Sequence, residues 1–486
     1  MATSNNTTNS YPLSSSQQDI WFDQLLHPDV PLYNIGGYLR IDGPINLALF
    51  EKALNQVILE NDALRLILQE GETLPTQTVA DPVPLQLNFY DFSETANAHQ
   101  SAQKWMETEF VKPFPLYNQL LFQSALLKLS EKCYYYFYRC HHLIVDGWAI
   151  SQLAQRLATA YNRLGDSQPL TEQKCYSYLD WVKNDQAYLE SDKLARHERY
   201  WLEKYQTLPA PRRISRQYAT SFKSHTIPSQ RSILHLSRSC YNQLTDFATT
   251  NQVTTFHLFI GVLYCYFVRT CDRGDLVIGL PVLNRSTAAF KQTVGLFASV
   301  SPAWFRFGTQ LNFVELIQAI RQELQKDYRH QRFPISTLNK RLKLHKEGRR
   351  QLFDIMLSYA KHDYDIHFNG KPAHAVYFTH GFEQNALAIF IEEFHQDDGV
   401  NIYFDYNLGF FAEEEIERLK ARFEFMLAEI LQKPSVPLVE LQIMPEAEIH
   451  QILVEFNDTK VDYQGYRTMK QVQPTHFQDK LHPIPP

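Results

Sequence analysis

The sequence predicts an α/β architecture, in which helices and strands follow one another along the chain. Three segments carry this prediction. Residues 46–61 repeat apolar side chains at helical spacing behind Asn46, a suitable N-cap. Residues 133–139 are rich in Tyr and Phe, which is typical of a buried strand. From Trp148 onward the apolar residues return to helical spacing, so a strand, a short loop and a helix come in succession.

The rest of the chain continues this mixture. A helical stretch covers residues 178–205, and residues 208–228, which hold three prolines, predict a linker between two halves. The second half shows no internal repeat of the first. There we expect strands at residues 232–236, 275–282, 353–359 and 401–406. We also expect one helix that ends near Thr270 and two further helices at residues 313–329 and 412–431.

The charge balance argues against nucleic acid as a main partner. The 486 residues include 47 Lys and Arg against 53 Asp and Glu, a formal net charge of -6. Hydrophobic residues make up 44% of the chain, but no apolar stretch reaches the roughly 18 residues that a bilayer span requires. The first ten residues lack the basic start and apolar core of a signal peptide. We therefore expect a soluble, cytoplasmic protein without a membrane partner.

The cysteines do not suggest a metal site. Their sequence positions are 133, 140, 175, 240, 265 and 271, which include no Cys-x-x-Cys pair. None of them is grouped with histidines as zinc ligands would be. We interpret them as reduced, structural thiols and expect no bound metal.

Candidate chemistry concentrates in the loop after the Tyr-rich strand. Here His141 and His142 are followed by Asp146 and Gly147. Histidine is the side chain best suited to exchange a proton near neutral pH. Asp146, four residues beyond His142, can fix a turn or form an ion pair. Gly147 lets backbone approach a ligand at a helix start, where free N–H groups can face developing negative charge.

Two other interpretations of this loop stay open from the residues themselves. A histidine in a loop often has a structural or solvated role, because strongly perturbed sites are a minority. His142 and Asp146 could instead bind a metal ion together, but no third ligand is apparent and catalytic zinc sites typically use three.

The string His141-His142-x-x-x-Asp146-Gly147 resembles the HHxxxDG signature of condensation domains of nonribosomal peptide synthetases, which belong to the chloramphenicol acetyltransferase-like superfamily. Asp19 and Ala298-Ser299 depart from the family's usual Arg and Val-Asn, which leaves the subtype and donor preference open. The resemblance covers about residues 11–455, and its other motifs stand in the family's order: residues 13–18 (LSSSQQ), 61–65 (NDALR), 176–181 (YSYLDW), 278–285 (IGLPVLNR), 294–297 (VGLF), 328–331 (YRHQ) and 352–356 (LFDIM).

The resemblance implies a two-lobed, V-shaped pseudo-dimer with mixed sheets flanked by helices and a central tunnel. Phosphopantetheine arms of a donor and an acceptor carrier protein would enter the tunnel as substrates, with no covalently bound cofactor. The acceptor's amine would attack the donor's acyl or peptidyl thioester to form an amide. His142 is the expected catalytic residue, as general base or as the group that orients the amine. Gly147 would bring a backbone N–H near the reacting carbonyl. His141 would brace the loop, and Asp146 would pair with Arg285.

The same resemblance predicts how the chain is divided. Residues 1–10 form a leader, 11–207 an N-terminal lobe with the HHxxxDG loop, 208–228 a linker, 229–455 a C-terminal lobe, and 456–486 a tail that resembles the start of an adenylation-domain linker. Adenylation domains are therefore further possible partners. The alternatives are an epimerisation domain, a coenzyme A-dependent acyltransferase, or an inactive domain that only binds carriers. A heterocyclisation domain would have acidic residues in place of the two histidines.

Overall fold

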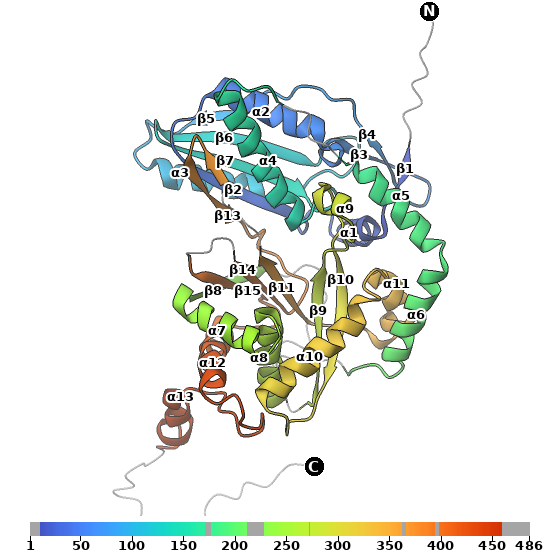
Figure 1. Ribbon diagram of the computed structural model, residues 1–486, viewed down its shortest axis with the longest axis vertical. Helices are drawn as coiled ribbons and strands as arrows, with labels where there is room; N and C mark the ends of the chain where they lie inside the picture. The colour runs from blue at the N-terminus through green and yellow to red at the C-terminus, as the bar shows by residue number, and fades with distance from the viewer. Residues whose placement is uncertain are drawn as a thin grey trace, which may run out of the picture.

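The structure is a computed structural model that describes residues 10–170, 176–210, 228–271, 273–361, 366–393 and 398–458. These residues form two lobes, one above the other in Figure 1, each built around a six-stranded sheet. The predicted α/β class, with two mixed sheets flanked by helices, is confirmed. The leader up to residue 9, residues 211–227 of the linker and the tail from residue 459 lie outside the described residues.

The N-terminal sheet has the strand order β12-β13-β2-β7-β6-β5, with β5 (Phe89–Asp91) at one edge. Strand β7 (Cys133–His141) lies between β2 (Asn34–Asp42) and β6 (Phe122–Ser130), and both pairings are antiparallel. Its even-numbered residues from Tyr134 to Cys140 pack with helices α2 (Leu47–Glu60) and α4 (Gly147–Gly165). Its odd-numbered residues from Cys133 to Phe137 pack with α3 (Ala98–Phe110). Helices cover both faces, which explains why this strand is an almost continuous aromatic run.

The C-terminal sheet has the strand order β10-β9-β11-β14-β15-β8. One face forms the core with four helices: α7 (Arg238–Thr250), α8 (Thr255–Thr270), α10 (Phe313–Tyr328) and α12 (Glu413–Gln432). The strands are β8 (Ser229–Leu236), β9 (Asp275–Val282), β10 (Ser299–Arg306), β11 (Ile355–Lys361), β14 (Leu387–Glu393) and β15 (Val400–Asn407). Residues alternate along β15, so that Ile402 and Phe404 lie in the core while Tyr403 and Asp405 lie on the other face of the sheet.

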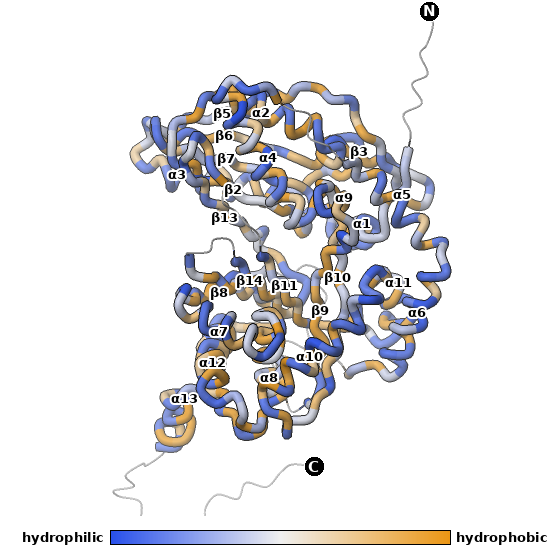
Figure 2. Tube along the Cα trace, viewed as in Figure 1, coloured by the Kyte–Doolittle hydropathy of each residue, from blue (hydrophilic) through white to orange (hydrophobic). Residues whose placement is uncertain are grey.

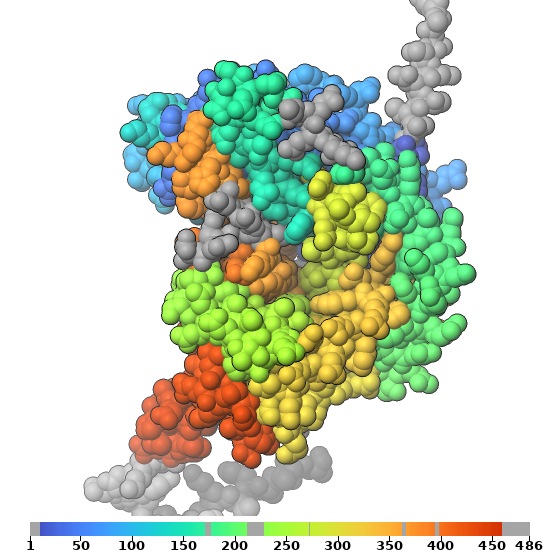
Figure 3. All heavy atoms as spheres, in the orientation of Figure 1, coloured from blue at the N-terminus to red at the C-terminus, as the bar shows by residue number. Residues whose placement is uncertain are grey.

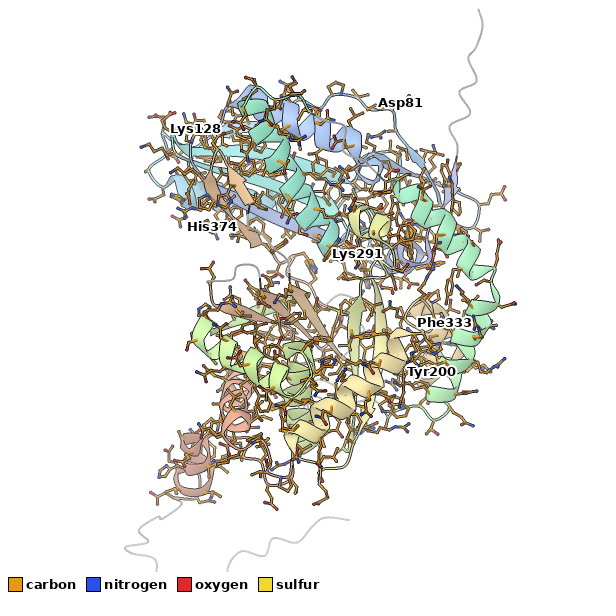
Figure 4. The ribbon with its side chains drawn as sticks, viewed as in Figure 1. Asp81, Lys128, Tyr200, Lys291, Phe333 and His374 are labelled. Atoms are coloured by element: carbon orange, nitrogen blue, oxygen red, sulfur yellow. The ribbon has the colours of Figure 1, made fainter. Side chains whose placement is uncertain are left out.

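Two segments of the second half cross to the first lobe. Strands β12 (Ile366–Phe368) and β13 (Lys371–Tyr377) extend the N-terminal sheet, because β13 pairs with β2 from Ala373 opposite Ile41 to Tyr377 opposite Gly37. The short helix α9 (Ala288–Gln292) packs on α4, where the Trp148 indole donates a hydrogen bond to the Lys291 carbonyl at 2.9 Å. Figure 4 shows Lys291 at this junction between the lobes. The division of the chain at residues 208–228 stays a prediction, and these crossings show that the N-terminal lobe uses residues from both halves.

The helices and strands expected from the sequence are present, with two differences. The stretch at residues 178–205 is broken into α5 (Tyr178–Leu189) and α6 (Asp192–Lys204), which join the lobes at the right of Figure 1. Ser191 causes this break, since its backbone is extended and its hydroxyl donates to the Tyr188 carbonyl at 2.7 Å. The helix that ends at Thr270 is α8, and a separate helix, α7, precedes it.

Apolar residues are spread along the strands and helices of both lobes (Figure 2). Within the described residues, no single helix has the length and apolar character to cross a membrane. The pair α7 and α8 meets that criterion only when taken together, across a bend of 98°.

Candidate active site

The HHxxxDG loop leaves the end of β7 and leads directly into α4. Backbone hydrogen bonds hold it on two sides. The His141 N–H donates to the Leu121 carbonyl at 2.9 Å, and the His142 N–H donates to the Tyr33 carbonyl at 2.8 Å. A third contact comes from the first motif, where the Gln17 side chain donates to the Leu143 carbonyl at 3.0 Å. These contacts anchor the end of the loop that follows β7, where His142 lies.

His141 is sealed inside the N-terminal lobe, with 1% of its surface exposed. Its Nδ1 accepts the Leu143 N–H at 3.1 Å, so the ring proton is on Nε2, which faces Gln24 Oε1 at 3.3 Å. Burial, and then the neighbouring His142, lower the pKa of His141 to about 3. This ring is neutral and fully engaged, which suits a brace of the loop.

His142 differs from its neighbour because it lies deep in the molecule and yet remains partly exposed. Burial lowers its pKa, while the Asp146 carboxylate and the backbone carbonyls of His142 and Val145 oppose this shift. Nδ1 is closed off from solvent and has no hydrogen-bond partner among the described residues. Carbonyl oxygens favour a proton on a ring nitrogen near them, so we assign the proton to Nδ1. That tautomer leaves the lone pair on Nε2, the nitrogen that remains open.

Asp146 accepts five hydrogen bonds. Its Oδ1 caps α4 by accepting the Ala149 N–H at 2.9 Å, and its Oδ2 accepts the N–H groups of Phe297 and Ala298 at 3.0 and 3.1 Å. Arg285 supplies the other two, at 2.6 and 2.9 Å, in a bidentate pair. Burial alone would raise the pKa of this carboxyl, but Arg285 and the other donors hold it below its ordinary value. A carboxylate so occupied is not available to a metal ion beside His142, and the described residues contain no cluster of three His, Cys, Asp or Glu side chains that could hold one.

Arg285 brings the C-terminal half of the chain to this loop. It follows β9, and its side chain also donates to the Gly295 carbonyl at 3.1 Å and lies 4.2 Å above the Phe297 ring. Gly295 has a φ of +156°, and a Cβ there would lie 2.0 Å from the Tyr178 ring, so a glycine is required at this position. The structure thus brings together Asp146 and Arg285, which are 139 residues apart.

Gly147 is the first residue of the 19-residue helix α4. Its Cβ position is empty, because an added methyl group would meet nothing within 4 Å. Neither a clash nor a left-handed backbone therefore requires glycine here. The N–H groups of the first helical turn have no partner within their own helix, and they carry the positive end of the helix dipole. Gly147 leaves room for a ligand next to these donors.

A cavity of about 740 Å³ reaches this region from the C-terminal lobe. Its wall includes the connection between α7 and α8, the carboxyl ends of β9 and β11, and Arg285. Figure 3 shows a hollow on this face of the molecule, bordered by α7 and α8, α9 and α10. The wall combines apolar residues, such as Phe256, Leu283 and Leu357, with hydroxyl and amide side chains, such as Thr249 and Gln331.

The C-terminal lobe adds several polar residues to the space between the lobes that no sequence motif had indicated. Arg231 forms a bidentate pair with Asp405, with both distances 2.7 Å. Burial raises the pKa of Glu383 and of Glu392 to about 7. His142 lies close enough to His380 to contribute, after burial and Arg231, to the lowered pKa of His380. These residues have no motif spacing. The pairing of β8, β14 and β15 brings Arg231, Glu392 and Asp405 together, whereas His380 and Glu383 lie in the connection from β13 to β14.

The family model of the condensation domain matches residues 7–453. Surfactin synthase subunit 1 of Bacillus subtilis (strain 168) is 26% identical over 477 residues, which are 97% of this chain and 13% of that protein. Dimodular nonribosomal peptide synthase of the same strain is 27% identical over 460 residues, 92% of this chain and 19% of the relative. The chain thus spans less than a fifth of the length of these relatives.

Solved structures agree with this match. The starter condensation domain of rhizomide synthetase, in complex with C8-CoA and Leu-SNAC, has a TM-score of 0.80 and 26% identity, covering 90% of this chain and 98% of that one. The first condensation domain of the calcium-dependent antibiotic synthetase also has a TM-score of 0.80, covering 90% of this chain and 100% of that one. Because its sequence identity is 21%, this similarity supports the fold alone. Condensation domains form amide bonds by acyl transfer. With its loop, its two lobes and this match over nearly the whole length, the chain belongs to the condensation domain family of nonribosomal peptide synthetases.

Proposed function

We propose that this chain transfers an acyl or peptidyl group from the phosphopantetheine thioester of a donor carrier protein to the amine of an aminoacyl group on an acceptor carrier. The observation that carries the proposal is the placement of the His142 ring, which is held on an anchored loop with Nδ1 closed off from solvent, so that Nε2, to which we assign the lone pair, is the nitrogen left open. The starter condensation domain that resembles this chain was solved with C8-CoA and Leu-SNAC. That pair of ligands supports an acyl donor and an aminoacyl acceptor here.

The chemistry assigned to His142 follows from its protonation. The amine nitrogen attacks the thioester carbonyl, a C–N bond forms and the C–S bond breaks. The amine must lose one proton, and the leaving thiolate gains one. Because its pKa is lowered, His142 is neutral at pH 7, so Nε2 accepts a hydrogen bond from the amine and holds the proton that passes to the sulfur.

The start of α4 supports the carbonyl side of the reaction. Negative charge develops on the carbonyl oxygen as the amine attacks. The first-turn N–H groups beside the open Gly147 position are donors of the kind that stabilise such an oxygen. Asp146 cannot serve as a base, since Arg285 and three backbone N–H groups occupy its oxygens. We assign Asp146 and Arg285 to hold the loop, and His141 to brace it.

The substrates enter as flexible arms in this proposal. The 740 Å³ cavity has Arg285, the partner of Asp146, in its wall, and its mixture of apolar, hydroxyl and amide side chains suits the methylene and amide groups of a phosphopantetheine arm. Carrier proteins, with adenylation domains that load them, are the proposed partners. A cytoplasmic location stays a prediction.

The test is a condensation assay with His142→Ala. Wild-type protein is mixed with an acyl-loaded donor carrier and an aminoacyl-loaded acceptor carrier, and the product on the acceptor is measured by mass spectrometry. We expect His142→Ala to lose at least about 100-fold in rate, the low end of general acid–base contributions, with an unchanged melting temperature. In a parallel reaction, a coenzyme A thioester replaces the donor carrier. This reaction tests the alternative that the chain is a coenzyme A-dependent acyltransferase. Turnover by His142→Ala at the wild-type rate would contradict the assignment.

A further inference from the structure

His380 stands where the chain passes from one lobe to the other. It follows β13, whose last partner in the N-terminal sheet is Gly37, and the next N–H, of Phe378, donates to the Gly36 carbonyl at 3.2 Å. Three residues after Phe378 the chain has joined the C-terminal lobe, because the Gly381 carbonyl accepts the Ser229 N–H of β8 at 2.9 Å. His380 is therefore held between an N-terminal and a C-terminal anchor.

The same strand, β2, connects His380 with His142. Gly36 of β2 receives the segment that leads to His380, and Tyr33, just before β2, receives the His142 N–H. Both histidines thus leave the N-terminal sheet at the same end. Electrostatics agree with this placement, since burial, then Arg231 and then His142 lower the pKa of His380 to about 4.

A tight turn fixes the orientation of the His380 ring. Gly381 has a φ of +76°, a left-handed conformation that favours glycine, and its N–H donates to the Thr379 hydroxyl at 3.2 Å. The His380 Nδ1 accepts the Phe382 N–H at 3.3 Å. Because Nδ1 is an acceptor in this contact and the ring is neutral, the proton is on Nε2. Nε2 has no hydrogen-bond partner among the described residues, and it is not closed off from solvent.

The two lobes therefore present complementary imidazoles. His142 offers a lone pair at Nε2, and His380 offers an N–H at Nε2. On the proposed function, the reaction needs both an acceptor for the amine proton and a donor for the carbonyl oxygen. We propose that His380 donates its Nε2–H to a substrate carbonyl oxygen in the space between the lobes, opposite His142. A neutral donor suits this place, because a charged one would repel the proton that His142 takes up.

Two substitutions separate this role from a structural one. Asn places an amide oxygen near the position of Nδ1, so His380→Asn can keep the bond to the Phe382 N–H but lacks a donor at the position of Nε2. Gln places its amide nitrogen near the position of Nε2, so His380→Gln restores that donor and loses the inner acceptor. Activity and stability should therefore rank the two variants in opposite order.

We expect His380→Asn to lower kcat/KM in the condensation assay by about 10- to 100-fold, somewhat less than the loss of one donor in a fully formed oxyanion hole. His380→Gln should stay within about 3-fold of wild type, the difference that a retained donor of altered geometry would leave. Melting temperatures should show the reverse, with His380→Asn close to wild type and His380→Gln lower. Wild-type activity in His380→Asn, or greater activity in His380→Asn than in His380→Gln, would overturn the proposal.

This inference rests on the proposed function, and the assays distinguish the failure of one from the failure of the other. If wild-type protein makes no amide from any donor and acceptor pair, the proposed function fails. If wild type is active, His142→Ala is inactive and His380→Asn is as active as wild type, the function stands and only the role of His380 is wrong.

Discussion

Two Arg–Asp pairs have similar geometry and different positions in the molecule. Asp146 and Arg285 join the HHxxxDG loop of the N-terminal lobe to the segment after β9, and their side chains are 2% and 1% exposed. Asp405 and Arg231 lie opposite each other on β15 and β8 of one sheet, and their side chains are 9% and 19% exposed. Both pairs are bidentate. The first pair fixes a loop that backbone hydrogen bonds hold at one end, whereas the second reinforces strands that are already paired.

The cost of losing a charge therefore depends on what else holds the same groups. Asp146 also accepts three backbone N–H groups, so its loss would release the start of α4 and the residues around Phe297 together. Within the described part of the chain, Asp405 has hydrogen bonds from the Arg231 side chain alone, and the β15–β8 ladder persists without them. We therefore expect the first pair to govern both stability and activity, and the second to govern stability alone.

Asp146→Asn should be the most damaging of these changes. The substitution keeps the size of the side chain but leaves Arg285 buried without its counter-charge, which typically costs about 3 to 5 kcal/mol. Unfolding by urea, followed by circular dichroism, measures the change. Condensation activity should fall with it even at temperatures where the variant is folded, because the loop that carries His142 is no longer fixed.

Asp405→Asn should have a smaller effect. Arg231 retains part of its solvent contact and lies 4.7 Å above the Tyr403 ring, so we expect a loss of about 1 to 3 kcal/mol. Below the melting temperature its condensation rate should match wild type. Equal losses of activity in the two Asn variants would remove the distinction between the pairs. Lys128→Ala, which removes a charge at the periphery of the N-terminal lobe, serves as the control and should change neither measurement (Figure 4).

The weakest effect that we expect is a pH dependence on the C-terminal side. Burial raises the pKa of Glu383 from 4.5 to about 7, so the folded protein binds an additional proton between these values. The resulting stability is fully present below pH 4.5 and is lost as the pH rises through about 7. Glu383→Gln removes this contribution, on the order of 1 to 2 kcal/mol after allowance for partial exposure. Its melting temperature should fall less than that of wild type between about pH 5 and pH 8. Parallel curves for the two proteins would show that Glu383 titrates normally.

Much of the fold follows from local patterns. Helical spacing predicted α2, α4 and α12 close to their observed bounds, and the Tyr-rich run predicted β7. The break at Ser191 was missed because the apolar period continues from α5 into α6, while the hydroxyl contact that ends α5 involves a single side chain. The crossing of β13 to the first sheet was not predictable either, since a strand's partner depends on tertiary packing and not on its own residues.

Which groups could react is already specified by the local sequence. His141, His142, Asp146 and Gly147 follow one another between a strand and a helix, so the chain cannot fold without placing them in one loop. Their protonation and hydrogen bonding come from tertiary packing. Tertiary packing buries His141 but leaves His142 partly exposed, and it surrounds Asp146 with five hydrogen-bond donors. It also brings His380 close to the HHxxxDG loop, and the carboxyl groups of the C-terminal lobe to the opposite side of the space between the lobes. These properties depend on burial and on charges within a few ångströms, and decisive neighbours, such as Arg285 and Phe297 at Asp146, come from segments more than 100 residues away in the chain.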